Sequence, residues 1–279
     1  METGRASQTA LRVAQRRAVH QILDHPHVLD DPIAVPLLSQ RFAFDETQES
    51  SRIERLFRAS MAARSRYAED RLAESVTQGI QQYVILGAGL DTFAYRNPFP
   101  QLRVFEVDFP ATQAWKRSLL AEAAIAEPAN LVFVPLDFEH KTLAEGLAEA
   151  GLDTKAPAFF GWLGVVLYLT LEAFRSTLES IARLPQGTGV CFDYGVPRHM
   201  LSPRAQEVFD ALAARVAAAG EPFRTFFTPD ELNTEFLRAG FHRFKQHNAE
   251  DLNSLYFSNR SDGLQVSSSG MSRMAAAWV

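Results

Sequence analysis

The stretch that decides the fold, residues 83–96, reads YVILGAGLDTFAYR. Its first four residues are apolar and predict a strand that is buried on both faces. Two glycines, Gly87 and Gly89, follow one residue apart, and an acid, Asp91, comes next. A glycine turn directly after a buried strand is typical of the first step of an open α/β sheet, where the backbone approaches a ligand closely. The stretch therefore predicts a ligand site and leaves the ligand to be identified.

Apolar runs and amphipathic segments alternate on the carboxyl side of this turn. The runs predict strands at residues 83–86, 104–107, 131–134, 158–161 and 189–193, with helices at 110–124, 142–150 and 171–183 between them. Two further strands, at 241–247 and 254–258, are expected to bring the sheet to seven. This order predicts a Rossmann-like α/β fold, with a mostly parallel seven-stranded sheet and helices on both faces.

The chain divides into three parts. Residues 1–80 contain no convincing strand, and helices at 10–23 and 51–76 predict an N-terminal helical cap on the sheet. Residues 81–260 form the predicted core, in which the segment 195–227 is expected to be a substrate insertion. Residues 261–279 begin with small and polar residues, so we expect a flexible tail there.

The composition excludes several classes of protein. The 279 residues carry a net charge of −5, so no basic surface for nucleic acid is expected. The single cysteine, Cys191, cannot form a disulfide within the chain, and no apolar run approaches the ~20 residues of a membrane span. We expect a cytoplasmic protein with a small-molecule partner, without nucleic acid or membrane as partners. The oligomeric state remains open.

The glycine turn departs from the dinucleotide pattern. A third glycine would be needed where Thr92 stands, and Asp91 lies where a pyrophosphate would bind. A negative charge there repels phosphate and favours a ligand with a positively charged end. The amino group and sulfonium of S-adenosylmethionine meet that requirement, so Gly87, Ala88, Gly89 and Asp91 are candidate contacts for this cofactor.

The ends of the next two strands support an adenosine site. The second strand ends with Glu106 and Asp108, and an acid at this place can accept hydrogen bonds from ribose hydroxyls. Both side chains are expected on one side of the strand, with Asp108 nearer its end. The third strand is followed by Asp137 and Phe138, which suit the adenine amine and ring. Lys116, in the helix between these strands, is expected to face solvent.

Several motifs together resemble a known family. They are ILGAGLDTFAYR, VFEVDFPATQAWKR, VPLDFE, LGVVLYLT and FDY, together with the N-terminal TALRVAQRRA and DDPIAVPLL. Over residues 9–194 the chain resembles the leucine carboxyl methyltransferase family. It is most similar to the bacterial branch of S-adenosylmethionine-dependent O-methyltransferases that act on polyketides and other small molecules.

The resemblance implies roles for particular residues. The glycine turn would lie against the methionine part of the cofactor, Asp108 would hold the ribose, and Asp137 with Phe138 would hold the adenine. Arg64, in the helix before the first strand, would meet a carboxylate of the cofactor or of the substrate. Residue pattern and resemblance together give this cofactor-binding set: Arg64, Gly87, Ala88, Gly89, Asp91, Glu106, Asp108, Asp137 and Phe138.

The catalytic candidates follow the fourth and fifth strands. Tyr168 would face the methyl-transfer region according to the resemblance, and Tyr194 and His199 lie where a substrate would enter. A carboxylate acceptor is already ionised at neutral pH, whereas a hydroxyl acceptor needs a base. The histidines and the cysteine show no metal-ligand spacing, so no metal is expected.

Two alternatives stay open besides a small-molecule O-methyltransferase. One is a protein C-terminal carboxyl methyltransferase. The protein-methylating members of the family have a glutamate near residues 162–163, however, and the segment GWLGVVLYL here has no acid. The other is a non-catalytic adenosine- or NAD-binding Rossmann protein, and the acid in the glycine turn argues against NAD.

Overall fold

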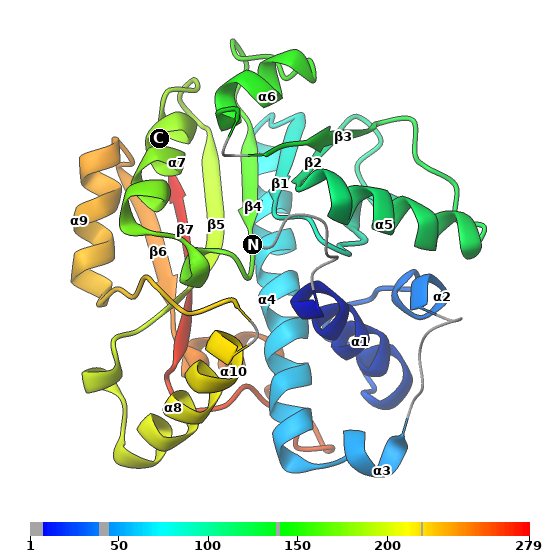
Figure 1. Cartoon of the computed structure of the whole chain (residues 1–279), viewed down its shortest axis with the longest axis vertical. Helices are drawn as coiled ribbons and strands as arrows, with labels where there is room; N and C mark the ends of the chain where they lie inside the picture. The colour runs from blue at the N-terminus through cyan, green and yellow to red at the C-terminus, as the bar shows by residue number, and fades with distance from the viewer. Residues whose placement is uncertain (1–7, 39–44, 138–139, 219) are drawn as a thin grey trace.

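The computed structural model describes residues 8–38, 45–137, 140–218 and 220–279. Seven strands form one sheet in the order β3-β2-β1-β4-β5-β7-β6 (Figure 1). Their bounds are β1 Gln82–Leu86, β2 Arg103–Asp108, β3 Leu131–Pro135, β4 Phe159–Trp162, β5 Gly189–Gly195, β6 Arg243–His247 and β7 Ser272–Trp278. The predicted class, a mostly parallel α/β sheet, is confirmed.

The position of the ligand site follows from the order of the strands. Strands β1 to β5 pair in parallel, and only β7 runs antiparallel to its neighbours β5 and β6. From β1 the chain proceeds to β2 and β3 on one side and then returns to β4 on the other. In sheets of this kind the ligand crevice lies beyond the carboxyl ends of the strands at such a reversal. The glycine turn follows β1 at that point.

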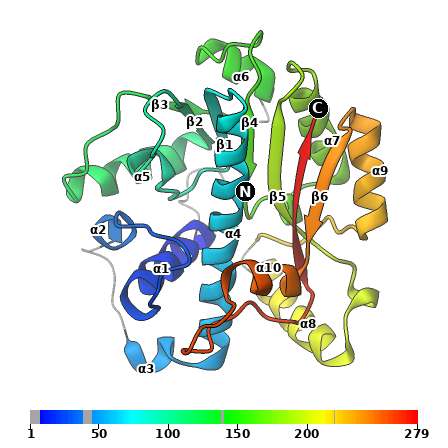
Figure 2. The same cartoon turned by 180° about the vertical axis from the view of Figure 1, so that it is seen from behind.

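Helices cover both faces of the sheet. On one face, the buried side chains of α6 (Leu143–Glu149), α7 (Leu171–Ala182) and α9 (Pro229–Ala239) pack against alternate residues of the strands. On the other face, buried side chains of α4 (Arg52–Thr77) and α10 (Ala249–Tyr256) do the same. Figure 2 shows these two helices from behind. Alternate strand residues thus point into two apolar layers, which explains the nearly continuous apolar runs in the sequence.

The described part of the N-terminal region is helical. It contains α1 (Gln8–Leu23), α2 (Ala34–Leu38), α3 (Glu46–Glu49) and the long helix α4. Figure 1 shows α1 and α2, in blue, beyond the carboxyl ends of β1 and β2. A third apolar cluster joins α1 and α2 to helix α5 (Pro110–Glu122) and to Leu90 of the glycine turn. The N-terminal helices therefore lie directly over the predicted ligand edge of the sheet.

Two helical elements follow β5: η3 (Arg198–Met200) and α8 (Pro203–Ala218). Two 3-10 turns occur earlier in the chain: η1 (Phe93–Tyr95) and η2 (Val166–Tyr168). Thr228 begins α9 with a capping box, and Gly240 ends it with φ of 103°. Both are common signals at the ends of helices.

Two predictions at the carboxyl end are wrong. The strand predicted at 254–258 falls on the end of helix α10 and the turn after it. The tail predicted to be flexible contains β7, whose residues Met274 to Trp278 are buried between β5 and β6. Three consecutive alanines in this strand have low intrinsic strand preference. Burial and pairing on both sides override that preference.

Candidate functional site

The glycine turn is shaped by the packing of the protein's own chain. Gly87 and Gly89 have φ of 66° and 49°, which side chains rarely adopt. A Cβ on Gly87 would lie 2.5 Å from a methyl of Val165, and one on Gly89 would lie 3.1 Å from Cβ of Ala10 in α1. The amide of Gly87 also donates to the carbonyl of Val107 at 2.8 Å. The glycines are therefore required by backbone conformation and by the close approach of two other segments.

Asp108 is joined directly to this turn. One carboxylate oxygen accepts from the amide of Gly89 at 2.5 Å, and the other accepts from the amide of Phe109 at 2.6 Å. Burial raises the pKa of Asp108, although these two amides and the hydroxyl of Thr112 oppose the rise. A carboxylate offers about four acceptor sites, so Asp108 keeps capacity for a ligand hydroxyl. The side chain is half-buried at the end of β2.

Asp91 is not a free negative charge. One oxygen accepts from the amide of Phe93 at 2.7 Å, and the other lies 3.3 Å from the guanidinium of Arg17 in α1. Its side chain is 20% exposed. Arg17 therefore compensates part of the negative charge of Asp91, the charge that was expected to exclude a pyrophosphate.

Glu106 does not reach the ligand edge. Its side chain is fully buried and accepts from the ammonium of Lys116 at 2.5 Å. Burial raises the pKa of Glu106 to about 7, even though Lys116 opposes the rise. Lys116 is 1% exposed, so the expectation that it faces solvent is wrong. Its ammonium finds a buried carboxylate and a carbonyl, which sequence pattern cannot reveal.

Arg64 lies at the corner between α4 and β5. Its guanidinium is 3.2 Å from a carboxylate oxygen of Asp193, whose other oxygen accepts from the amide of Gly164 at 2.6 Å. A Cβ on Gly164 would lie 3.0 Å from Arg64. Nε of Arg64 is buried and has no hydrogen-bond partner among the described residues. The guanidinium thus keeps an unused donor for an incoming carboxylate.

Asp193 was missed by the sequence analysis. It stands in the FDY motif and is the acid of β5, 8% exposed, opposite Arg64. The segment after β4 lacks the glutamate of the protein-methylating members, and Asp193 supplies an acid at that corner from the neighbouring strand. The available signal was an acid within an otherwise apolar strand.

Tyr168 is half-buried beside this corner. Burial raises the pKa of Tyr168, the charges of Glu221 and Asp193 add to the rise, and Arg64 opposes it. Its ring lies 5.6 Å from that of Phe223. The Tyr168 phenol is thus close to the Arg64–Asp193 pair and to the segment that follows α8.

Four half-buried rings form what we call the aromatic cluster: Tyr168, Phe209, Phe223 and Phe226. Phe209 and Phe226 have ring centres 5.5 Å apart, and Phe223 and Phe226 have theirs 6.3 Å apart. The segment that carries two of the rings is tied to η2, since the amide of Arg224 donates to the carbonyl of Leu167 at 2.7 Å. The three phenylalanine rings of the cluster therefore lie next to Tyr168 and remain partly exposed to solvent.

Other predicted residues do not join this group. Tyr194 is fully buried, and its hydroxyl donates to Gln246, so the structure does not bring it to the crevice. Its side chain points into the apolar layer of α7 and α9, opposite to that of Asp193, because neighbouring strand residues alternate. His199 is exposed in η3, near Glu231. Asp137 is partly exposed after β3, and Phe138 lies outside the described residues.

A buried polar network fixes α1 over the glycine turn. Arg17 bonds to Asp31 at 2.8 Å and to Thr92 at 2.6 Å. Arg96, on the far side of the turn, lies 3.4 Å from Asp31 and pairs with Glu69 at 2.5 Å. Helices α1 and α4 and the turn are thus joined by charges that pair within the protein.

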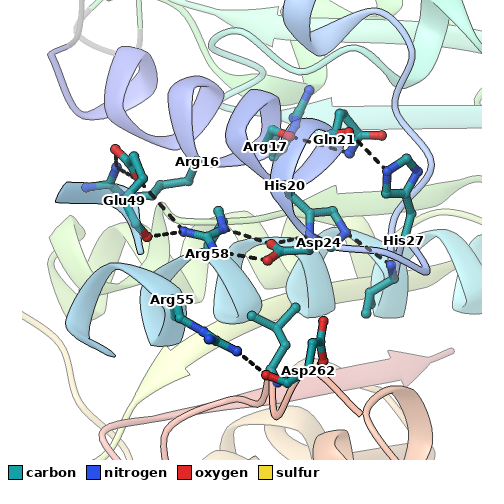
Figure 3. A network of polar contacts seen from close by, with 12 residues as sticks. Arg16, Arg17, His20, Gln21, Asp24, His27, Glu49, Arg55, Arg58 and Asp262 are labelled. Carbon is teal, nitrogen blue, oxygen red and sulfur yellow. Dashed lines mark hydrogen bonds and ion pairs between the residues drawn. The ribbon is translucent and has the colours of Figure 1, made fainter. Parts of the chain in front are cut away.

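A second group in the network joins α1 to α4, as Figure 3 shows. Arg58 donates to both oxygens of Asp24, at 2.7 and 2.9 Å, and to the carbonyl of Glu49 at 2.7 Å. His20 is 2.9 Å from Asp24 through Nδ1, while its Nε2 accepts from the amide of Val28 at 3.0 Å. Burial favours the neutral carboxyl, but the bonds from Arg58 and His20 lower the pKa of Asp24 to about 2. The charged side chains of this group are therefore structural.

Two features are absent from the described part of the chain. Among the described residues, no helix is long and apolar enough to cross a membrane. In the same part of the chain, no group of three or more His, Cys, Asp or Glu side chains is placed to hold a metal ion.

Comparisons with known proteins identify relatives of this chain. The family model described as leucine carboxyl methyltransferase matches residues 10–182. YktD of Bacillus subtilis (strain 168), whose name assigns it to the S-adenosyl-L-methionine-dependent methyltransferases, is 32% identical over 294 residues, covering 95% of this chain and 96% of its own length. A Mycolicibacterium vanbaalenii protein with the same assignment is 34% identical and covers 68% of this chain and 67% of its own length.

Solved structures share the fold at low sequence identity. A DUF574 family protein from Streptomyces avermitilis has a TM-score of 0.59 at 18% identity, covering 94% of this chain and 96% of its own. A Thermobifida fusca protein named as a methyltransferase has a TM-score of 0.57 at 17% identity, covering 99% and 96%. Magnesium protoporphyrin IX methyltransferase from Synechocystis, crystallised with bound SAH, has a TM-score of 0.50 at 12% identity, covering 95% and 99%.

Proposed function

We propose that this protein methylates an oxygen atom of a small molecule. The premise is that the chain belongs to the leucine carboxyl methyltransferase family and is an S-adenosylmethionine-dependent methyltransferase. The acceptor oxygen belongs to a carboxylate or a hydroxyl group on a largely apolar molecule, such as a polyketide. The aromatic cluster beside Tyr168 carries this proposal, because half-buried rings next to the transfer site suit an apolar ligand.

The residues at the strand ends fit the cofactor. Arg64 offers its unpaired Nε to the cofactor carboxylate, and Asp108 offers its remaining acceptor capacity to the ribose. The glycine turn between them takes the methionine part, and Asp137 takes the adenine. When bound, S-adenosylmethionine supplies a methyl group that is already activated by the positive charge on sulfur.

The protein's contribution is then alignment and exclusion of water. The helix α1 packs over the glycine turn through Ala10, and Thr9 donates to Glu221 at 2.5 Å, which joins α1 to the segment before α9. These contacts cover the turn from the side opposite the sheet. Holding two reactants in line can lower a barrier by roughly 7–11 kcal/mol. Tyr168, at the edge of this cover, orients the acceptor oxygen.

The demand for a base depends on the acceptor. A carboxylate needs none, because its usual pKa is about 4. A hydroxyl must lose a proton, and Glu221 is the carboxylate whose charge acts most strongly on the Tyr168 phenol. Glu221 is therefore the proposed proton acceptor for a hydroxyl substrate that Tyr168 orients.

The setting of the reaction is also part of the proposal. Cys191 is free and buried, which agrees with a reducing compartment, and we place the enzyme in the cytoplasm, in secondary metabolism. The net charge of −5 gives no electrostatic reason for nucleic acid as a partner.

A labelling experiment tests the proposal. The protein is incubated with S-adenosylmethionine carrying a labelled methyl group and with extract of the host, and the labelled products are separated by size and identified by mass spectrometry. We expect label in a small apolar compound, with at least tenfold less product for Tyr168→Phe than for the wild type. Release of the label by mild base would identify a carboxyl ester. Label only in the protein fraction would contradict the proposal and favour a protein carboxyl methyltransferase.

A further inference from the structure

A buried lysine is bonded directly to the glycine turn. Lys116 projects from α5, and its ammonium donates to the main-chain carbonyl of Asp91 at 2.6 Å and to Glu106 at 2.5 Å. It also lies 5.5 Å from the centre of the Tyr95 ring. With 1% of its surface exposed, Lys116 has lost almost all contact with water. Burying an ammonium is costly unless its partners are well placed, so the partners indicate its role.

Asp91 is held from two sides by buried cations. Lys116 of α5 bonds its main-chain oxygen, and Arg17 of α1 lies 3.3 Å from its carboxylate. Its own amide donates to the carbonyl of Ala88 at 2.8 Å, which closes the turn. The two cations come from different helices, and both contact Asp91.

Glu106 places the lysine. It comes from the middle of β2. In the described part of the chain only one of its carboxylate oxygens is bonded, the one that accepts from Lys116, while Oε1 is buried and unpaired there. A buried carboxylate with one unused oxygen is a poor contribution to stability. An apolar pair of similar size would often pack at least as well. The pair is therefore better explained by what Lys116 does for the turn.

We propose that Lys116 and Glu106 are positioning residues that hold the glycine turn in its cofactor-binding conformation. Lys116 fixes the carbonyl of Asp91, and Glu106 holds Lys116 in place. A turn with two glycines in left-handed conformations has many alternatives when its last carbonyl is released, and ordering it again would weaken cofactor binding. This inference rests on the proposed function only in that the ligand of the turn is S-adenosylmethionine.

The test compares a single and a double variant. Lys116→Met removes the donor to Asp91 and leaves Glu106 unpaired, whereas Glu106→Leu with Lys116→Met removes both charges. Arg117→Met is the matched control, because Arg117 is the next residue of α5 and its side chain is 56% exposed. For each protein the Kd for S-adenosylhomocysteine is measured by calorimetry, and Tm is measured without ligand.

We expect the single variant to lose both stability and affinity. The double variant should regain a Tm close to that of the wild type, yet keep a Kd about tenfold higher, which corresponds to about 1.4 kcal/mol. Arg117→Met should leave Kd and Tm unchanged. The double variant keeps the test available if Lys116→Met alone does not fold.

Two results would overturn the inference. A double variant that binds S-adenosylhomocysteine as tightly as the wild type would show that the pair acts on stability alone. A double variant that does not fold would show that the pair is needed for the fold rather than for the turn. A failure of the proposed function is seen separately, since it concerns the acceptor and the labelled product of the wild type, whereas these measurements use no acceptor.

Discussion

At the scale of single residues, Asp193 balances part of the charge of Arg64 at the corner between α4 and β5. It accepts from the amide of Gly164 and pairs with Arg64, so the charge of Arg64 is partly balanced before any ligand binds. A fully unpaired buried arginine would be costly, while a fully paired one would have no donor left. The observed arrangement lies between these limits and leaves Nε for a carboxylate.

Arg64 should recognise only the amino-acid end of the cofactor. Arg64→Met is expected to raise the Kd for S-adenosylhomocysteine at least tenfold, because a charge-assisted hydrogen bond is worth roughly 1.5–3 kcal/mol. Binding of 5′-methylthioadenosine, which lacks the carboxylate, should stay within about threefold of the wild type. Calorimetry with both ligands checks this. An equal loss for both ligands would mean that Arg64 supports the fold of the site instead.

Asp108 should act on the nucleoside end. Asp108→Asn removes the charge that accepts from Gly89 and from a ribose hydroxyl, so we expect both ligands to bind more weakly, by roughly 1.5–3 kcal/mol. Asp210→Asn is the control, since Asp210 forms an exposed pair with Arg198 far from β2. Unchanged affinity for both ligands would remove Asp108 from the site.

The residues that sequence could predict are those with a local signal. The glycine turn, Asp108 and Arg64 are each recognisable from a strand end or from a motif. Lys116 was wrongly expected to face solvent and Asp193 was missed, because the role of each depends on partners elsewhere in the fold. Glu106 and Tyr194 were expected at the ligand edge, but both side chains are buried within the protein. Strand alternation gives the direction of a side chain but not which groups surround it.

At the scale of elements, β7 is the clearest departure from the sequence-based prediction. Its buried residues Met274 to Trp278 pair with β5 on one side and β6 on the other. Ala276 lies in the apolar layer of α4, which contacts β7, whereas Ala275 and Ala277 lie in the opposite layer. Burial on both faces, and not intrinsic preference, therefore makes this run a strand.

A charge placed in β7 should unfold the protein. Ala276 is fully buried opposite Cys191, so Ala276→Asp would bury a carboxylate without a partner. We expect a loss of at least about 3 kcal/mol in the free energy of unfolding, measured by urea titration. Ser272→Asp, at the exposed start of the same strand, should change the stability by less than about 0.5 kcal/mol. Similar, small effects of both substitutions would contradict the central place of β7.

At the scale of the whole molecule, stability should depend on the protonation of Glu106. The pKa of Glu106 is about 7 in the folded protein, against 4.5 for the free group, because burial favours the neutral form. Between these values the folded chain keeps a proton that the unfolded chain has released. This group therefore lowers the free energy of unfolding as pH rises from about 4.5 to about 7, and contributes no further change above that. Lys116, Asp91, Asp108 and Tyr95 are the charged or titratable groups that face it.

The variant Glu106→Gln isolates this contribution. Other groups titrate in the same range, so the quantity to follow is the difference in free energy of unfolding between the variant and the wild type at pH 5, 6, 7 and 8. We expect the variant to gain relative stability by about 1–3 kcal/mol from pH 5 to pH 7. A difference that does not change with pH would mean that Glu106 is ionised throughout.

Much of the architecture was predictable because four of the first five strands, β1, β2, β4 and β5, are buried on both faces over most of their length. Such strands give continuous apolar runs, and each is separated from the next by a helix or a turn with clear punctuation. The edge strand β6 was predicted although none of its residues is fully buried, whereas β7 was missed because it follows small and polar residues and contains three consecutive alanines. The placement of α1 over the glycine turn was not predicted, because its charged residue Arg17 pairs with distant parts of the chain.

The insertion of β7 between β5 and β6 has a consequence for synthesis. Residues 243–247 leave the ribosome before residues 272–278, yet they have no neighbour in the sheet until the later segment arrives. Domains made on the ribosome tend to fold from the amino-terminal side as they emerge. The nascent protein must therefore keep the edge of β5 open until residues 272–278 have emerged from the ribosome, and the sheet is completed only when they arrive.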